Sequence, residues 1–361
     1  LAMVFPAHRH AMDVTLIQRE YLLPEGAIGS VEVQYGGRVD LRDVVARGTI
    51  PSRHVILDVA EFFRLRRREA AQDLLLVEQG AAVEAGQALA GKAADRGKRL
   101  LSPVTGIVAY IGDGRIILQE TPEIMDLQAG VQGQVIGVQE GRGVMIETIG
   151  ALVQGVWGNN RRVIGTLRIE PPDGLESIFG DQLNMQFRGA IVVTRRQLKA
   201  TGLMILSDQG IAGVIAPSMD ADLRDMALSS EAGILLTEGF GSMRMGNTIA
   251  SLLEGLNGKQ ATLDATLADR LDKRRPEVIV NIAVRAEARP GLPDVAQTLK
   301  TGSTVRLTNE PYAGFAGRIL DLPKTPVLMD NGLRVPCATV ELFTGEHVNV
   351  PLANLELFGK A

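Results

Sequence analysis

The sequence predicts a multidomain protein that is mainly β, with a small α/β domain in its middle. The chain has 361 residues, more than a single hydrophobic core usually organises. Forty glycines and only 4% aromatic residues suit many short strands joined by tight turns. Strand-like and helix-like segments alternate after residue 189, which is typical of a parallel sheet. We expect a β-rich region over 1–170, an α/β domain over 171–288 and a β module over 289–361.

The composition is that of an ordinary soluble globular protein, with 45% hydrophobic and 22% charged residues. The net charge of −4 disfavours binding to nucleic acid, which usually requires a basic surface. Cys337 is the one cysteine of the sequence, which excludes an intrachain disulfide and favours a reducing, cytoplasmic compartment. No apolar run approaches the ~20 residues of a membrane span. His8 and His10 lack a third ligand nearby, and His54 and His347 stand alone, so we expect no metal and no cofactor.

The β-rich region begins with short strands and contains two similar hairpins. The segment 54–69 predicts a strand that runs into a short helix, with Arg66–Arg68 near the helix end, where positive charge is favourable. The segments 106–120 and 133–147 align without a gap at an offset of 27 residues. Each reads as a strand, a glycine-containing turn and a strand. We expect these repeated hairpins to build one compact all-β domain.

Two phrases in this region resemble the barrel-sandwich hybrid family, which includes biotinyl and lipoyl domains. They are Val77–Ala90, with its spaced glycine, valine and Leu-Ala ending, and Leu101–Tyr110, with its Ser-Pro and Gly-Ile-Val. In that family, carrier domains present a lysine at the hairpin tip between these phrases. Lys92 and Lys98 occur there without the flanking residues of a carrier. The resemblance therefore implies a structural hybrid barrel with ordinary surface lysines.

The middle of the chain predicts the α/β domain. The expected strands are 189–193, 210–216, 233–238 and 277–284, and the expected helices are 195–204, 222–229, a helix ending near residue 255, and 265–275. Ser218 or Asp220 can cap the second helix. The clearest linker of the chain is 287–293, which contains two prolines and a glycine.

A glycine-rich turn between the third strand and its helix is the best candidate for chemistry. In Thr237–Arg244, the backbone of Gly239 and Gly241 and the side chains of Ser242 and Arg244 could bind an anion at the helix N-terminus. Neither a dinucleotide nor a Gly-Lys-Ser/Thr phosphate spacing is present, so a tight connection explains the glycines as well. The carboxylates of Asp220 and Glu238 follow adjacent strands and could meet at the sheet edge where such folds bind ligands, although caps or surface charges account for them equally.

The C-terminal segment closely resembles the KOW motif of the NusG family and related ribosomal proteins. The resembling residues are Gly302–Leu307 and Pro311–Ile319, with Gly314 and Gly317 at the turn glycines and aromatic residues at 312 and 315. Glu310 departs from the motif, which has glycine before the proline. The resemblance implies an SH3-like barrel, whose later strands we expect at 335–342, 347–350 and 355–357.

In that family the module binds RNA, ribosomal proteins or transcription factors. Between Lys300 and Lys360 there are six basic and six acidic residues, so the excess of positive charge that RNA affinity usually needs is absent. The resemblance and this balance favour protein contact, although the aromatic residues could simply fill the barrel. The expected binding surface consists of Arg306, Tyr312, Phe315, Arg318 and Phe343.

Three functions remain open from the sequence. The favoured one is a non-enzymatic scaffold or adaptor subunit with protein partners, including copies of itself, and no membrane span. The second is a transcription- or translation-associated factor that binds RNA or the ribosome through the KOW-like module. The third is a nucleotide- or phosphate-binding enzyme, or a redox-complex subunit, that uses the Thr237–Arg244 turn.

Overall fold

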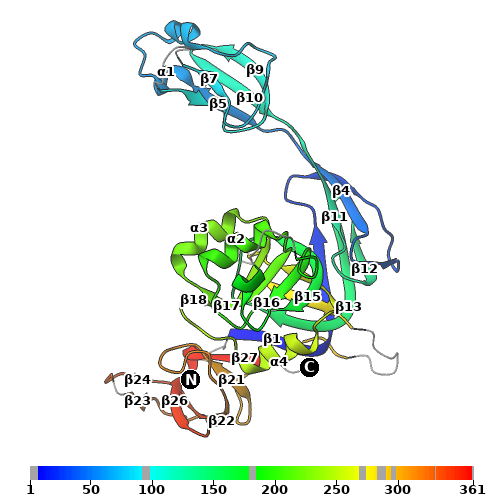
Figure 1. Cartoon of the computed structure of the whole chain (residues 1–361), viewed down its shortest axis with the longest axis vertical. Coiled ribbons are helices and arrows are strands. Elements are labelled where there is room, and N and C mark those ends of the chain that lie inside the picture. The colour runs from blue at the N-terminus through cyan, green and yellow to red at the C-terminus, as the bar shows by residue number, and fades with distance from the viewer. Residues whose placement is uncertain are drawn as a thin grey trace.

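The computed structural model describes residues 7–91, 98–178, 184–267, 274–282, 290–293, 298–329 and 331–359. Strand accounts for 46% of the structure and helix for 14%, which confirms a mainly-β chain. The protein has a broad base and a narrow arm that carries a separate module away from it (Figure 1).

A small parallel sheet forms the α/β part of the base. Its four strands lie side by side in chain order, β15 (Arg162–Ile169), β16 (Ala190–Val193), β17 (Gly213–Met219) and β18 (Gly233–Phe240). Nearly every residue of β16, β17 and β18 is buried, because helices cover both faces. One face packs against η2 (Leu175–Ile178), α2 (Ala200–Asp208), η3 (Ala221–Leu223) and α3 (Arg224–Ser229), and the other against α4 (Asn247–Gly255).

The expected strands of this sheet and the helices near 222–229 and 255 are confirmed, but the first helix begins five residues later than predicted. The backbone N–H of Leu198 donates to Ser218 O (2.8 Å), and Leu198 forms an isolated bridge with Met219. The segment before Ala200 is therefore held as an extended extra partner of β17, which delays the helix. The predicted helix at 265–275 and the start of the predicted linker fall largely outside the described residues.

Two long strands connect the parallel sheet to the rest of the molecule. β1 (Ala7–Leu22) and β13 (Gly143–Gln154) run antiparallel along most of their length. β13 also pairs with β20 (Glu277–Asn281), and β20 pairs with β19 (Gln260–Asp264). β19 pairs in turn with β15. Through these pairings, one hydrogen-bonded sheet extends from β14 (Trp157–Gly158) to the C-terminal module. The boundary expected at residue 170 falls between two neighbouring strands of this sheet.

The arm is a twisted three-stranded sheet. Its strands are β2 (Ile28–Val31), β4 (Val44–Ile50) and β11 (Glu123–Gln128). At its foot, β3 (Arg38–Val39) and β12 (Gly133–Gln139) join the edge of β13 around a core that includes Val31, Val45 and Ile146. The arm rises from this point, and the chain between β4 and β11 forms the distal module (Figure 1).

The distal module has its own core, separate from that of the base. One sheet has the order β5-β10-β9-β6, and a second pairs β7 with β8. The elements are β5 (His54–Asp58), α1 (Val59–Phe62), η1 (Arg68–Leu74), β6 (Ala82–Val83), β7 (Ala88–Ala90), β8 (Leu100–Leu101), β9 (Gly106–Gly112) and β10 (Arg115–Glu120). The strand running into a short helix is confirmed, but α1 already ends at Phe62. Arg66–Arg68 instead lead into η1, with Arg67 as its N-cap, so the expected placement of these arginines at a helix end is wrong.

Both predicted hairpins exist, but they do not build one domain. β9 and β10 form the first hairpin in the distal module, whereas β12 and β13 form the second at the foot of the arm. The two segments align because each forms a hairpin of two short strands joined by a glycine-containing turn. Separate placement corrects the expectation of a single compact domain that contains both.

The C-terminal module is an antiparallel sheet in the order β27-β21-β22-β25-β26 around its own core. Its strands are β21 (Thr304–Leu307), β22 (Ala316–Asp321), β25 (Cys337–Leu342), β26 (His347–Pro351) and β27 (Leu355–Gly359), with η5 (Leu352–Asn354) before β27 and a small hairpin of β23 (Val327–Leu328) and β24 (Arg334–Val335). The start of β1 pairs in parallel with β27. The start of β1 therefore connects this module to the base.

Candidate functional site

The predicted glycine-rich turn lies where β18 ends and α4 begins. Gly239 and Gly241 have φ angles of +113° and +107°, which glycine adopts without the strain that other residues would suffer. The N–H of Gly241 donates to Met219 O (2.9 Å), and the N–H of Met243 donates to Ser218 Oγ (3.1 Å). The Ser218 hydroxyl also donates to Met243 O (3.1 Å). The turn is thus fixed by the end of β17, and these donors are already used.

The position expected for a bound anion contains a carboxylate of the chain itself. Glu238 Oε1 accepts the N–H of Gly246, the residue that caps the N-terminus of α4, at 3.3 Å. A negative charge there is favoured by the helix dipole. Ser242 and Arg244, the two side chains expected to bind the anion, are both exposed. Glu238 therefore supplies the charge that the turn was expected to take from a ligand.

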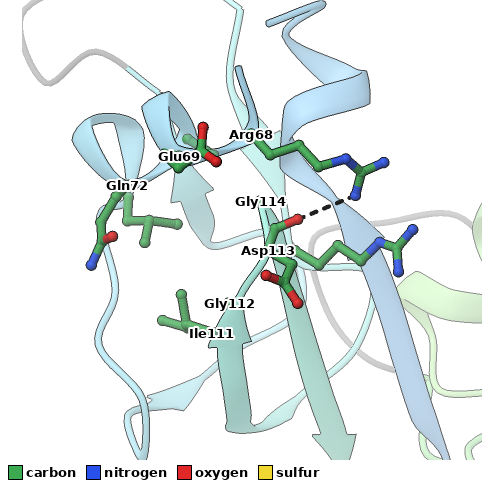
Figure 2. Close-up of a pocket in the computed structure, with 10 residues that line it drawn as sticks. Arg68, Glu69, Gln72, Ile111, Gly112, Asp113 and Gly114 are labelled. Carbon is green, nitrogen blue, oxygen red and sulfur yellow. Dashed lines mark hydrogen bonds between the residues drawn. The ribbon is translucent and has the colours of Figure 1, made fainter. Parts of the chain in front are cut away.

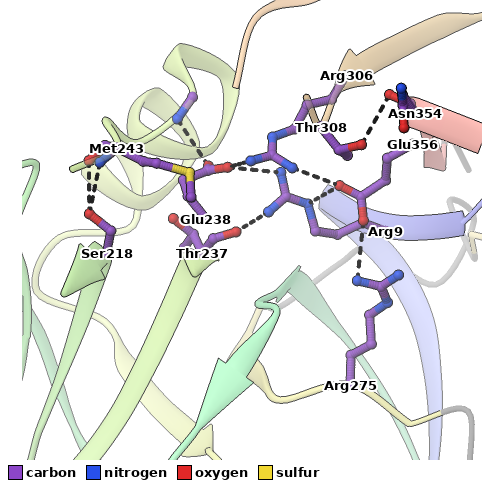
Figure 3. Close-up of polar contacts among 11 residues, drawn as sticks. Arg9, Ser218, Thr237, Glu238, Met243, Arg275, Arg306, Thr308, Asn354 and Glu356 are labelled. Atoms are coloured by element: carbon purple, nitrogen blue, oxygen red, sulfur yellow. Dashed lines mark hydrogen bonds and ion pairs between the residues drawn. The ribbon is translucent and has the colours of Figure 1, made fainter. Parts of the chain in front are cut away.

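Glu238 belongs to a buried cluster of charged side chains, which we call the junction cluster: Arg9, Glu238, Arg275, Arg306 and Glu356. Glu238 Oε2 is paired with Arg306 Nη2 and lies 3.7 Å from Arg9 Nη2. Glu356 Oε2 lies 3.3 Å from Arg9 Nε and 3.1 Å from Arg306 Nη1, and its Oε1 lies 3.1 Å from Arg275 Nη1. Figure 3 shows these side chains converging from separate elements.

The junction cluster joins three parts of the fold. Arg9 is on β1, Glu238 on β18, and Arg306 and Glu356 are on β21 and β27 of the C-terminal module. Arg9 Nη1 also donates to the backbone carbonyl of Thr237, across 228 positions in sequence. Four of the five side chains are at most 5% exposed, and that of Arg275 is 27% exposed. The cluster holds the C-terminal module against the end of the parallel sheet.

Burial governs the electrostatics of the junction cluster. Desolvation and the neighbouring Arg9 charge lower the pKa of Arg306 to about 10, and desolvation lowers the pKa of Arg9 against the opposing effect of Glu356. The Arg306 guanidinium therefore stays charged at neutral pH. Buried charges are tolerated when each has a hydrogen-bonded partner of opposite sign. The described arrangement is thus suited to holding parts together, and it offers no nucleophile and no acid–base pair for chemistry.

The two carboxylates expected to meet at the sheet edge have separate partners. Asp220 is exposed and accepts a hydrogen bond from Gln197 Nε2 at 2.7 Å, whereas Glu238 is buried against arginines. Neither Ser218 nor the Asp220 side chain caps the helix that follows β17. The contacts of Asp220 and Glu238 therefore do not favour acid–base catalysis by the two carboxylates together.

The expected binding surface of the C-terminal module is divided by the structure. Arg306 is only 4% exposed and belongs to the junction cluster, so it is not on a docking surface. Tyr312 packs edge-on against Phe315 at 6.1 Å, and its hydroxyl donates to Glu346 at 2.6 Å. Phe315 and Phe343 are 43% and 66% exposed, and Arg318 is also exposed. The accessible part of the predicted surface is therefore aromatic and carries little charge.

The two predicted sites lie next to each other. A Cβ atom added at Gly314, which has a φ of +87°, would come within 3.9 Å of the carbonyl oxygen of Arg244. The KOW-like turn thus packs against the backbone of the glycine-rich turn. The sequence showed both segments but gave no sign that they face each other.

The distal module contains a small cavity of ≈ 210 Å³ between η1 and the β9–β10 turn (Figure 2). Arg68 Nη1 donates to Asp113 O at 3.2 Å, and Asp58 lies 3.3 Å from Arg68 and 3.2 Å from Arg115. The same Asp58 caps α1, and the N–H of Glu61 and these two arginines lower its pKa. Two of the charged residues that line the cavity, Arg68 and Arg115, are therefore already paired with Asp58.

Of the two lysines between the barrel-sandwich-like phrases, the structure describes Lys98. Lys98 donates to the carbonyl of Phe62 at 2.5 Å and lies 4.1 Å above the Phe62 ring, which is a structural contact. Lys92 lies outside the described residues.

No metal site or membrane helix appears in the parts of the chain that the structure describes. No group of three or more potential ligands is gathered there. His10 is buried, and its backbone N–H donates to Gln154 Oε1 at 3.1 Å. Cys337 is buried, and desolvation raises the pKa of its thiol. Within the described ranges, no helix has the length and apolar character to cross a bilayer.

Comparison with known proteins gave no matching family model and no matching curated relative. Sequence reasoning missed Arg9, Arg275 and Glu356. A signal for Glu356 existed, because it stands in a short strand between Leu355 and Leu357, both of which are buried in the module core.

Proposed function

We propose that this protein is a non-enzymatic scaffold or adaptor subunit that holds a larger assembly together through protein contacts. The observation that carries the proposal is the contrast between its two ends. The base is fixed at the edge of its parallel sheet by the junction cluster, while the arm holds a separately folded module far from that base (Figure 1).

The edge of the base argues against a ligand-driven activity. Open α/β sheets usually bind ligands at the carboxyl ends of their strands. Here the Thr237 carbonyl and the Glu238 carboxylate at that edge are bonded to Arg9 and Arg306 of other elements. A nucleotide or phosphate would have to displace buried ion pairs, which disfavours the enzyme and nucleotide-binding alternatives.

The arm has the features of a firm spacer. A Cβ added at Gly48 would approach Leu23 Cδ1 to 2.7 Å, so the arm strand β4 lies directly on the chain that follows β1. Val31, Ala46 and Leu127 lie in one cross-strand row on the face that packs toward the base. Hydrogen-bonded strands with a packed face keep the distal module at a defined distance, as docking on a partner requires.

The test removes the distal module and keeps the arm. Ile50 and Glu123 are directly opposite each other in β4 and β11, so an Asn-Gly turn can replace residues 51–122 and close the arm as a hairpin. We expect the full chain to purify as an oligomer, or with a stoichiometric protein partner, and the shortened chain to lose that association. Trp157 fluorescence verifies that the base of the shortened chain is folded. A full chain that is strictly monomeric and retains no partner would refute the proposal.

A further inference from the structure

In the described part of the distal module, the sheet ends in an open strand edge. β5 is the terminal strand of the sheet β5-β10-β9-β6, and among the described strands it pairs with β10 alone. Its register with β10 runs from His54–Gln119 to Asp58–Arg115 without a bulge. Exposed edges are normally protected by a lysine, a proline, a bulge or a covering element. β5 contains no lysine or proline, so its unpaired edge is ready to accept another strand.

An exposed apolar row crosses the outer face of the same sheet. Ile56 is opposite Ile117, which is opposite Tyr110, so the three side chains form one row over three strands. Ile56 is 63% exposed and Tyr110 46% exposed. Ile107, 50% exposed, stands in the next row on that face. Contiguous apolar surface of this kind on a soluble protein marks an interaction site.

The sequence of β5 is suited to pairing with itself. An antiparallel pair with its two-fold axis at Ile56 places Ile56 opposite Ile56 of the second copy, and Val55 opposite Leu57. His54 then stands opposite Asp58, so no like charges face each other. The apolar row continues across the axis as Tyr110, Ile117 and Ile56 of one copy followed by the same three in reverse order. Cross-strand apolar pairs are the main stabilising unit of sheets.

The arm makes this pairing sterically possible. The distal module stands at the far end of the arm, with the base and the C-terminal module at the opposite end of the molecule (Figure 1). The base and the C-terminal module therefore do not cover the distal module, and a second copy can reach it. If β5 paired with a different surface of the second copy, one β5 edge would stay open for further copies. Two-fold pairing of β5 with β5 uses the open edges of both copies and gives a closed dimer.

We propose that the occupant of this edge is a second copy of the chain, and that two distal modules pair through β5 into one continuous sheet of eight strands, four from each copy. This inference rests on the proposed scaffold function and gives it a defined contact surface.

The experiment uses the full chain in sedimentation velocity over a concentration series. Ile56→Lys puts a charge at the centre of the edge and should weaken the dimer at least about 100-fold. Ile124→Lys is the matched control, because Ile124 is an isoleucine of an exposed strand position on the arm (79% exposed) that is not in the proposed interface. Equal circular-dichroism melting curves for the two variants would show that the fold is unchanged.

A second variant tests the axis itself. Opposed Cα atoms in an antiparallel pair are about 4.5–5.5 Å apart, within the range for a disulfide. Ile56→Cys should therefore form a covalent dimer under mild oxidation, whereas Ile124→Cys should not. The native Cys337 is 1% exposed and does not compete.

Loss of the dimer in Ile56→Lys alone, with crosslinking of Ile56→Cys, supports the inference. An oligomer that survives Ile56→Lys overturns it and leaves the scaffold function standing on another surface. A full chain that stays monomeric, with Ile56→Cys uncrosslinked, overturns it as well, and the partner association described above then decides the scaffold function. Binding of a different protein that requires Ile56 would show that the edge has another occupant.

Discussion

Replacing Glu356 with glutamine tests whether the junction cluster holds the C-terminal module against the parallel sheet of the base. Glu356 accepts ion pairs from Arg9 and Arg306 through Oε2 and from Arg275 through Oε1, at 3.1–3.3 Å. Glutamine keeps the shape of the side chain and removes its charge. The change therefore isolates the electrostatic contribution from packing.

The expected loss follows from the burial of the three arginines. Removing one partner of a buried ion pair costs about 3–5 kcal/mol, because the remaining charge cannot regain water. Arg9 and Arg306 are 0% and 5% exposed and would lose the charge of Glu356 while keeping their ion pairs to Glu238, whereas Arg275 is 27% exposed and can be rehydrated. We therefore expect Glu356→Gln to lower the free energy of unfolding of the base by about 3–4 kcal/mol.

Trp157 gives a direct assay. It is the single tryptophan of the sequence, it pairs with Leu236 beside the cluster, and it packs against Phe240 at 5.3 Å. Urea unfolding followed by its fluorescence reports the stability of this region. The control is Asp126→Asn, which breaks the exposed Arg47–Asp126 pair (60% and 49% exposed) and should cost less than about 1 kcal/mol. A Glu356→Gln loss no larger than that of the control would refute the reasoning.

Three other predictions concern single groups. Burial raises the pKa of Tyr21 from 10.0 to about 12, so between these pH values the folded protein keeps a proton that the unfolded chain loses. The stability that this group contributes is therefore complete below pH 10 and falls between pH 10 and 12. At pH 11.5 the free energy of unfolding should have dropped by about 2 kcal/mol more in the wild type than in Tyr21→Phe. Burial raises the pKa of the Cys337 thiol, so a thiol reagent at pH 8 should label it only after urea unfolding, and rapid labelling of the folded protein would contradict its packing. The hydrogen bond to Glu346 raises the pKa of Tyr312, so an ultraviolet pH titration of Glu346→Gln should show Tyr312 ionising at lower pH, and an unchanged titration would exclude that hydrogen bond in solution.

The local elements were predictable because their signals are local. Continuous apolar runs bounded by glycines predicted β16, β17 and β18, since strands covered on both faces need apolar residues at every position. Glycine turns between short apolar runs predicted the hairpins β9–β10 and β12–β13. In contrast, the sheet that contains the hairpins depends on pairing between distant strands, for which the sequence offers no local pattern.

The junction cluster could not be predicted for the same reason. No local pattern marks Arg9, yet the structure places it against Thr237 and Glu238 through the pairing of β1 with β27. The sequence predicts Arg306 on the binding surface of the C-terminal module, whereas packing of the module on the parallel sheet buries it. Glu238 was considered as a possible acid, and its role as the partner of Arg306 became visible only when three separate parts of the chain came together.

Membership in an assembly is tested most directly by the molar mass of the intact protein after gentle purification, measured by light scattering on a size-exclusion column. We predict a particle well above the 38.7 kDa of one chain, either a dimer or a complex with a fixed ratio of partner to chain. A single species of 38.7 kDa at every concentration would contradict it.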